Sequence, residues 1–257
     1  MKRILGAVAV AALFSAAPAL AATSMVEFTG KSLVNGVNGN ARTFTSTDKT
    51  VNVRATAWSW DGNRVRDSFL GAFGSGLGVT SGDELGLGNT HVTDNQKRVD
   101  FILLQFDQTV QLTSAFFNAF SFNGKTDSDA TIGWGTLAGA WNQGLTFNNT
   151  DGMALKGLLT GQADALGNSM SGSRSLNLGN ASGNFWLIGA NFANVDKKID
   201  GFKLGGVTLK TVAPVPEPST WAMMLAGFAL VGVAMRRAIR TSEQRFTDKV
   251  RRIATSG

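Results

Sequence analysis

Through most of the chain, short apolar runs alternate with clusters of glycine, asparagine, serine and threonine. In residues 50–58, Val51, Val53, Ala55 and Ala57 occupy every second position, and the positions between them are polar. Alternation with a period of two is typical of a strand that buries one face. This pattern predicts a β-strand whose four small apolar side chains point into a core.

Further apolar runs extend the strand pattern along the chain. Residues 100–106 (DFILLQF) predict a more buried strand, and residues 110–122 predict a long aromatic strand that bends or breaks near Ser114. Other strands are predicted at 130–134, 185–192 and 202–210, and the two stretches with helical character are 153–159 and 163–166. Many short strands separated by glycine-rich turns predict an all-β domain at 22–212, an antiparallel β-sandwich or jelly roll.

The pattern changes at residue 213. Alternating prolines make residues 213–220 a stiff linker. Residues 221–235 are apolar and carry no charge, and Arg236 and Arg237 follow directly. Although this run is shorter than the roughly 20 residues that span a bilayer, the arginines can snorkel. We therefore predict a single transmembrane helix at 221–237, with its arginine end in the cytoplasm.

Residues 238–257 form a basic tail beyond the predicted transmembrane helix. Apolar side chains recur there at helical spacing, at Ile239, Phe246, Val250 and Ile253. One interpretation is a basic amphipathic helix on the anionic inner leaflet. The other is a solvated cytoplasmic tail, and the sequence leaves both open.

The first 21 residues predict a secretory signal peptide. Lys2 and Arg3 form a basic start, residues 4–17 are apolar, and Ala19-Leu20-Ala21 provides small residues before a cleavage site. The body is therefore expected outside the inner membrane, as an anchored precursor that is later released to the cell surface or extracellular matrix.

The order of features near the C-terminus resembles the PEP-CTERM sorting signal of bacteria that produce exopolysaccharides. The residues that carry the resemblance are Pro216, Glu217, Pro218, Trp221, Arg236 and Arg237. The resemblance implies that a membrane protease, the exosortase, recognises the triplet and processes the protein. The chain departs from the family pattern in one respect, because some twenty residues follow the arginines.

A second resemblance lies within the body, to a family of exosortase-dependent surface proteins. Its skeleton in this chain is Gly-Leu-Gly-Val at 76–79, then His91-x-x-Asp94-Asn95, then a strand opening with Asp100. The resemblance implies sorting and an exported domain, and it implies no enzymatic activity.

Charge and composition narrow the possible functions. The whole chain has a formal charge of +6, yet residues 23–213 hold 15 basic and 15 acidic side chains. The excess therefore lies in the targeting segments, and the body has no basic surface that would favour a nucleic-acid partner. The absence of cysteine excludes thiol catalysis and cysteine-ligated metals.

Three kinds of chemistry remain for the body. His91 with Asp94 supplies two members of a catalytic triad, but no Gly-x-Ser-x-Gly elbow supplies the serine, so a structural histidine is favoured. Loop oxygen ligands suit calcium, and the best set is Asp94, Asn95, Asp127 and Asp129, although such residues also form turns. Trp58 and Trp60 share a strand face, which suits either sugar stacking or core packing.

The sequence thus predicts a non-enzymatic surface or matrix protein that an exosortase sorts, with a structural or adhesive role in biofilm or floc. No cofactor is expected apart from the possible calcium. Exopolysaccharide is a possible partner, and a carbohydrate-binding module at the same location is the alternative function. A hydrolase that uses His91 is the third.

Overall fold

The computed structural model describes residues 22–29, 40–82, 84, 91–167, 171–212 and 218–255. The chain divides into two compact units, Met1–Val212 and Ala213–Gly257. The predicted signal peptide, together with Pro216 and Glu217 of the sorting triplet, lies outside the described residues.

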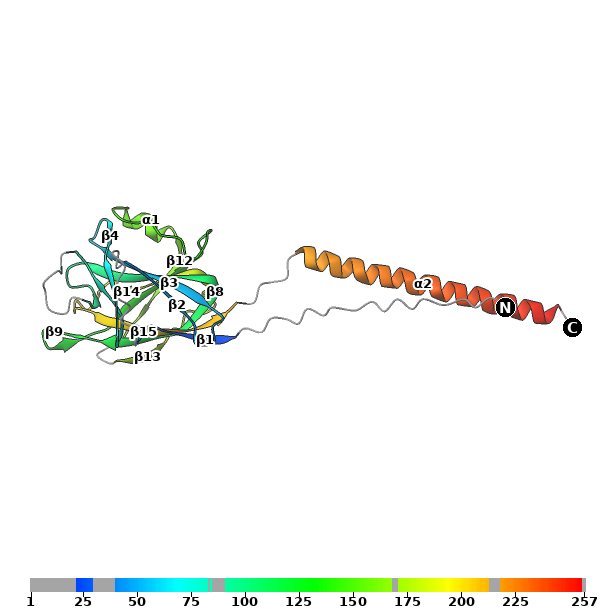
Figure 1. The fold of residues 1–257 in the computed structure, drawn as a ribbon, viewed down its shortest axis with the longest axis horizontal. Helices are drawn as coiled ribbons and strands as arrows, with labels where there is room; N and C mark the ends of the chain where they lie inside the picture. Colours follow the sequence, from blue (N-terminus) through cyan, green and yellow to red (C-terminus); the bar gives the residue numbers. More distant parts are fainter. Residues whose placement is uncertain are drawn as a thin grey trace. The chain divides into compact units, whose positions relative to one another are not determined.

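The first unit is built around β8 (Val99–Ala119), a strand of 21 residues. Its first part pairs with β3 (Asn52–Trp60) on one side and β14 (Gly183–Ala190) on the other. Its second part pairs with β13 (Gly172–Ser175) and β15 (Gly201–Thr211). Because β8 exchanges one pair of neighbours for another, it runs through both layers of a β-sandwich (Figure 1).

The remaining strands extend the two layers. In the first layer, β2 (Ala41–Thr45) and β4 (Val65–Asp67) pair with β3, while β11 (Ala130–Gly135) joins β14 to β12 (Leu159–Ala165). In the second layer, β1 (Thr23–Glu27), β6 (Gly76–Thr80) and β7 (Thr93–Asp94) pair with β15, and β5 (Phe69–Phe73) pairs with β6. A separate hairpin joins β9 (Ser121–Phe122) to β10 (Lys125–Thr126). All these pairings are antiparallel, which confirms the predicted fold class.

The main core lies between the two layers and takes its side chains from alternate positions of the strands. Val53, Ala55 and Ala57 of β3 are completely buried there, as the alternation predicts. Trp186 of β14 and Phe202 of β15 fill the same core. Burial of this apolar surface supplies the main driving force for folding of the unit.

A second apolar cluster covers the outer face of the first layer. Phe101 and Leu103 of β8 are buried in it, while Ile102 and Leu104 point into the main core. Its cover includes α1 (Gly152–Lys156), whose N-cap Asp151 accepts a hydrogen bond from Met153 N. Burial on both faces explains why residues 101–104 of β8 are continuously apolar rather than alternating.

Two details of the sequence prediction are wrong. Residues 100–106 and 110–122 are not separate strands, because β8 continues through Asp107 and ends at Ala119. Residues 163–166 do not form a helix, since residues up to Ala165 belong to edge strand β12 and pair with β11. In both cases strand pairing between distant segments determines the structure, and a local pattern does not record it.

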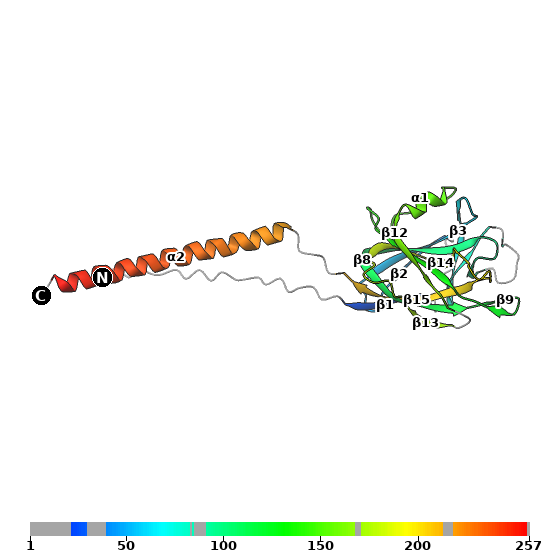
Figure 2. The same ribbon diagram turned by 180° about the vertical axis from the view of Figure 1, so that it is seen from behind.

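The second unit contains α2 (Pro218–Ala254), one continuous helix of 37 residues. It includes the segment Trp221–Ala254, which is long and apolar enough to span a membrane and has none of its apolar window buried. The helix therefore continues past Arg236 and Arg237 into the predicted tail. Figures 1 and 2 show its unbroken course.

Candidate functional site

The sorting segment presents its side chains at the start and middle of α2. Pro218 is the first residue of the helix, a position where its missing N–H costs nothing and its fixed φ suits the helix. The indole of Trp221 is 52% exposed, and Arg236 and Arg237 are exposed as well. Large apolar side chains between them, including Phe228 and Leu230, are also exposed. Such a surface requires an apolar environment outside the helix, and a bilayer provides one.

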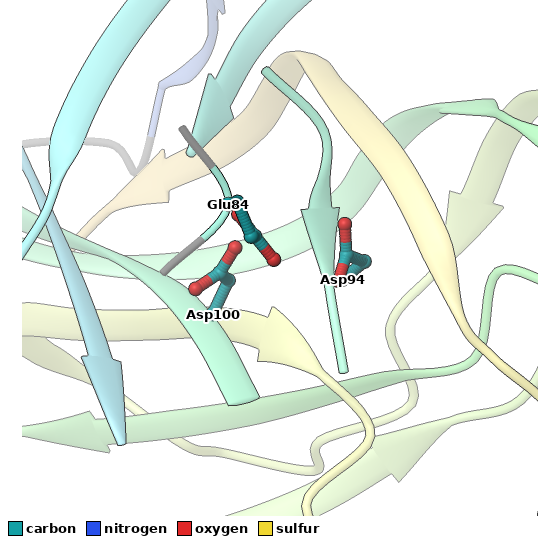
Figure 3. Close-up of side chains that lie close together, drawn as sticks. All are labelled: Glu84, Asp94 and Asp100. Carbon is teal, nitrogen blue, oxygen red and sulfur yellow. The ribbon is translucent and has the colours of Figure 1, made fainter. Parts of the chain in front are cut away.

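Among the described residues of the sandwich, buried or partly buried carboxylates form two separate groups. The first consists of Glu84, Asp94 on β7 and Asp100 on β8, all buried, with ligand oxygens within 4.8 Å of one another. Figure 3 shows these three side chains side by side. Two backbone amides bind this group, because Ser81 N donates to Glu84 Oε2 at 3.0 Å and Gln96 N donates to Asp94 Oδ1 at 2.9 Å.

The glycines of the Gly-Leu-Gly-Val run explain how this corner is built. Gly76 has a φ of +115°, and a Cβ there would collide with the backbone of Leu204 in β15. A Cβ on Gly78 would overlap the carbonyl group of His91. Both glycines therefore serve close approach of neighbouring backbones. Gly76 lets β6 approach β15, and Gly78 lets β6 approach His91.

The second group consists of Asp127, Asp129 and Asp200, and its ligand oxygens also lie within 4.8 Å of one another. Asp127 and Asp200 are buried, whereas Asp129 is partly exposed. Asp200 directly precedes β15, and Gly201 N donates to the backbone carbonyl of Asp127 at 2.9 Å. This backbone bond brings the loop after β10 to the start of β15.

Burial and mutual repulsion dominate the electrostatics of the second group. Burial, followed by the negative charges of Asp127 and Asp129, raises the pKa of Asp200 to about 7. Burial also raises the pKa of Asp129, while its hydrogen bond from Gly167 N opposes the change. Carboxylates that repel one another in a desolvated site favour a proton or a cation nearby.

The structure divides the four calcium ligands that the sequence predicts. Asp94 belongs to the first group, and Asp127 and Asp129 belong to the second. The side chain of Asn95 is committed to Asp200: Nδ2 donates to Asp200 Oδ2 at 2.6 Å, and Oδ1 accepts from Asp200 N at 2.9 Å. Asn95 therefore positions an aspartate that is not among the ligands predicted from the sequence. The only local signal for Asp200 was its position directly before a strand.

His91 and Asp94 do not form a catalytic pair in this structure. The ring Nδ1 of His91 lies 2.9 Å from Thr80 Oγ1, and the ring packs beside Phe69 and Phe73. Burial and the nearby charge of Lys203 lower the pKa of His91. The surroundings of the ring are those of a packed, hydrogen-bonded histidine, which agrees with the structural interpretation.

The two tryptophans predicted as sugar platforms lie in the second apolar cluster. Trp58 is 2% exposed, donates from Nε1 to Thr56 Oγ1 at 2.8 Å and packs edge-on against Phe147. The ring of Trp60 stacks on Phe192 with centroids 5.9 Å apart. Sugar stacking requires an open ring face. Trp58 has no such face, so the packing corrects the idea of a two-tryptophan platform.

Comparison with known proteins identifies one segment. Residues 214–238 match the family model of the PEP-CTERM protein-sorting motif. No curated protein and no solved structure matches the chain. The matched segment contains the proline-rich triplet, the apolar part of α2 and both arginines, so the chain carries a PEP-CTERM sorting motif. The motif implies processing by an exosortase and a C-terminal helix that anchors an exported precursor in the membrane.

Proposed function

We propose that this protein is delivered by an exosortase to the cell surface or exopolysaccharide matrix, where the β-sandwich has a structural or adhesive role in biofilm or floc. The observation that carries the proposal is the sorting motif at 214–238, in a unit separate from the sandwich. A sandwich of this size has a core of its own, which suits a domain that remains folded after release.

Three further observations agree with a structural rather than catalytic role. His91 is packed against aromatic rings, and its ring bonds to a threonine. Both tryptophans considered for sugar binding pack in an apolar cluster. The formal charge of the body is zero, so counterion release does not drive its association with polyanions. Adhesion by this body therefore depends on neutral polar and apolar contacts.

The test of sorting replaces the triplet Pro216-Glu217-Pro218 by alanines in the native host. We expect the variant to accumulate uncut in the inner membrane, because the protease no longer recognises the segment before α2. Cell fractionation and mass spectrometry of the mature C-terminus measure the result, and a strain without the exosortase is the reference. A variant that still reaches the surface at the parent's mature mass would refute the proposed sorting.

The structural role needs a separate test, because sorting alone does not establish it. Deletion of the coding sequence should weaken biofilm or floc, and expression of the parent should restore it. The alanine-triplet variant should fail to restore it, since its sandwich stays attached to the inner membrane through α2. Unchanged biofilm and floc after deletion would refute the structural or adhesive role and leave the sorting proposal intact.

A further inference from the structure

We infer that Asp127, Asp129 and Asp200 form a binding site for a calcium ion, with Asn95 as the residue that positions Asp200. The three carboxylates come from two loops that are far apart in the sequence, and one oxygen from each lies within 4.8 Å of the others. A calcium ion binds oxygens at 2.3–2.6 Å, so two oxygens on the same ion lie at most about 5 Å apart. The spacing therefore fits shared coordination.

Unsatisfied oxygens supply a second, independent observation. Among the described residues, Asp127 Oδ1 and Asp200 Oδ1 are buried and have no hydrogen-bond partner. Asp127 and Asp200 are each only 1% exposed, so water does not solvate these oxygens freely. A buried carboxylate oxygen without a partner is costly, and such oxygens are almost always satisfied in folded proteins. A cation held between the carboxylates satisfies both.

One oxygen of each carboxylate is already hydrogen-bonded, while the second oxygen of Asp127 and of Asp200 has no hydrogen-bond partner. Asp127 Oδ2 binds Lys198 Nζ at 3.3 Å, and Asp200 Oδ2 accepts from Asn95 Nδ2 at 2.6 Å. Asp129 Oδ1 accepts from Gly167 N at 2.5 Å. These bonds fix the orientation of each carboxylate. A preorganised set of oxygens of this kind loses little freedom when an ion binds.

Two cationic side chains stand near the group without replacing an ion. Lys198 binds Asp127 and also Asp196 at 2.8 Å, and its side chain is 47% exposed. The guanidinium of Arg174 donates to the backbone carbonyls of Ser128 and Ala165 and to the Ser128 hydroxyl, so these three hydrogen bonds go to partners other than the carboxylates. The two cations therefore lower the net negative charge of the group but leave Asp127 Oδ1 and Asp200 Oδ1 without a donor.

The ligand type and surroundings favour calcium over other metals. The ligands are hard carboxylate oxygens, with neither histidine nor cysteine among them. Such a ligand set favours calcium, magnesium or manganese over zinc. Three carboxylates fill part of a shell of six to eight oxygens, and water can complete it on the partly exposed side of Asp129. Such an irregular and partly open shell suits calcium better than magnesium, which demands octahedral geometry.

The experiment uses the full chain in detergent, stripped with EDTA and titrated with CaCl₂. Isothermal titration calorimetry should show calcium binding that persists in a millimolar excess of Mg²⁺. Because the ion binds only the folded state, a hundredfold excess over Kd should raise the melting temperature by about 5 °C or more. A melting curve indifferent to EDTA and calcium, with no binding heat, would overturn the site.

Three variants assign the binding to this group. Asp129→Asn preserves an oxygen that accepts from Gly167 N but removes a charge at a partly exposed position, so it should fold. Asp200→Asn removes a buried charge that faces two others. Each should lose one equivalent of bound calcium and the associated rise in melting temperature. Asp196→Asn is the matched control, because the charge of Asp196 acts on Asp129 and Asp200 but its carboxylate is not one of the three clustered ligands.

The outcomes separate the alternatives. Calcium binding that is lost in Asp129→Asn and Asp200→Asn but retained in Asp196→Asn supports the site. Binding that both variants retain but Asp100→Asn loses would place the ion in the first group and overturn the assignment. An equal loss in all three variants at residues 129, 196 and 200 would show general charge attraction, and that result would also overturn it.

Discussion

In the β-sandwich, Trp186 and Phe101 are completely buried, whereas in α2 the side chains of Met223 and Leu230 are 75% and 72% exposed. Both regions are rich in large apolar residues, but only the sandwich provides its own apolar surroundings. The apolar side chains of the helix need apolar surroundings that the chain itself does not supply, such as a bilayer. The apolar run of the helix ends at Arg236 and Arg237. The comparison teaches that stability of the body and attachment to the membrane are separate properties of this chain.

The largest expected effect comes from the core. Trp186→Ala removes a fully buried indole that packs near Trp134 and donates from Nε1 to Gly183 O at 3.0 Å. It should lower the free energy of unfolding by about 4 kcal/mol, since large-to-small substitution leaves a cavity. Urea denaturation of the full chain in detergent measures this. Trp221→Ala is the control in α2 and should leave the body's stability unchanged; equal losses would contradict the separation.

The converse substitution addresses the helix. Phe228→Arg places a charge near the middle of the apolar run, which should cost about 3 kcal/mol of membrane insertion. The variant should appear in the soluble fraction after alkaline extraction of membranes, while the melting temperature of the sandwich stays the same. Phe228→Leu is the control and should remain in the membrane. A shift in the sandwich's melting temperature would show that the two units are coupled.

A backbone test probes the corner at β6. Gly76→Ala should destabilise the sandwich by about 2 kcal/mol, because φ is +115° and a Cβ meets the backbone of Leu204. Gly74→Ala is the matched control, since a Cβ there has nothing within 4 Å and should change stability by less than about 0.5 kcal/mol. Thermal unfolding of the two variants should differ clearly, and membrane attachment should be the same in both. Equal stability would contradict the role given to Gly76.

The smallest expected effect concerns acid. Hydrogen bonds from Arg64 N, the Arg66 guanidinium and Asn63 N lower the pKa of Asp61 to about 2. Its pKa is about 3.9 in the unfolded chain, so the stabilisation is present above pH 4 and is lost as the pH falls towards 2. Asp61→Asn should therefore melt below the parent at neutral pH, and the difference should shrink over that window. A constant difference would refute this assignment.

The sequence was sufficient for features that depend on local pattern. The alternation around Val53 and Ala55 predicted both a strand and its buried face, and an apolar run followed by arginines predicted the membrane segment. Each of these signals lies within a few residues of the chain. The order of residues is enough in such cases, because the same physical rule acts at every position of the pattern.

Features that depend on pairing between distant strands were not accessible. Nothing near Asp107 shows that β8 continues there from one layer into the other. Asp200 was missed as a site residue because it comes near Asp127 only through a backbone bond between distant loops. Asn95 was predicted as a calcium ligand, but its amide is hydrogen-bonded to Asp200. Asp94 likewise lies in the first carboxylate group, whereas Asp127 and Asp129 lie in the second.

The position of β15 has a consequence for the timing of folding. This strand is the last of the sandwich, yet its neighbours β1, β6, β7 and β8 all come from the first half of the chain. The second layer therefore cannot close until Thr211 has been synthesised and has crossed the membrane. Contacts of such long sequence separation form late and slowly. The sorting motif begins within a few residues of Thr211, so the strand that completes the fold crosses the membrane only as the motif arrives there.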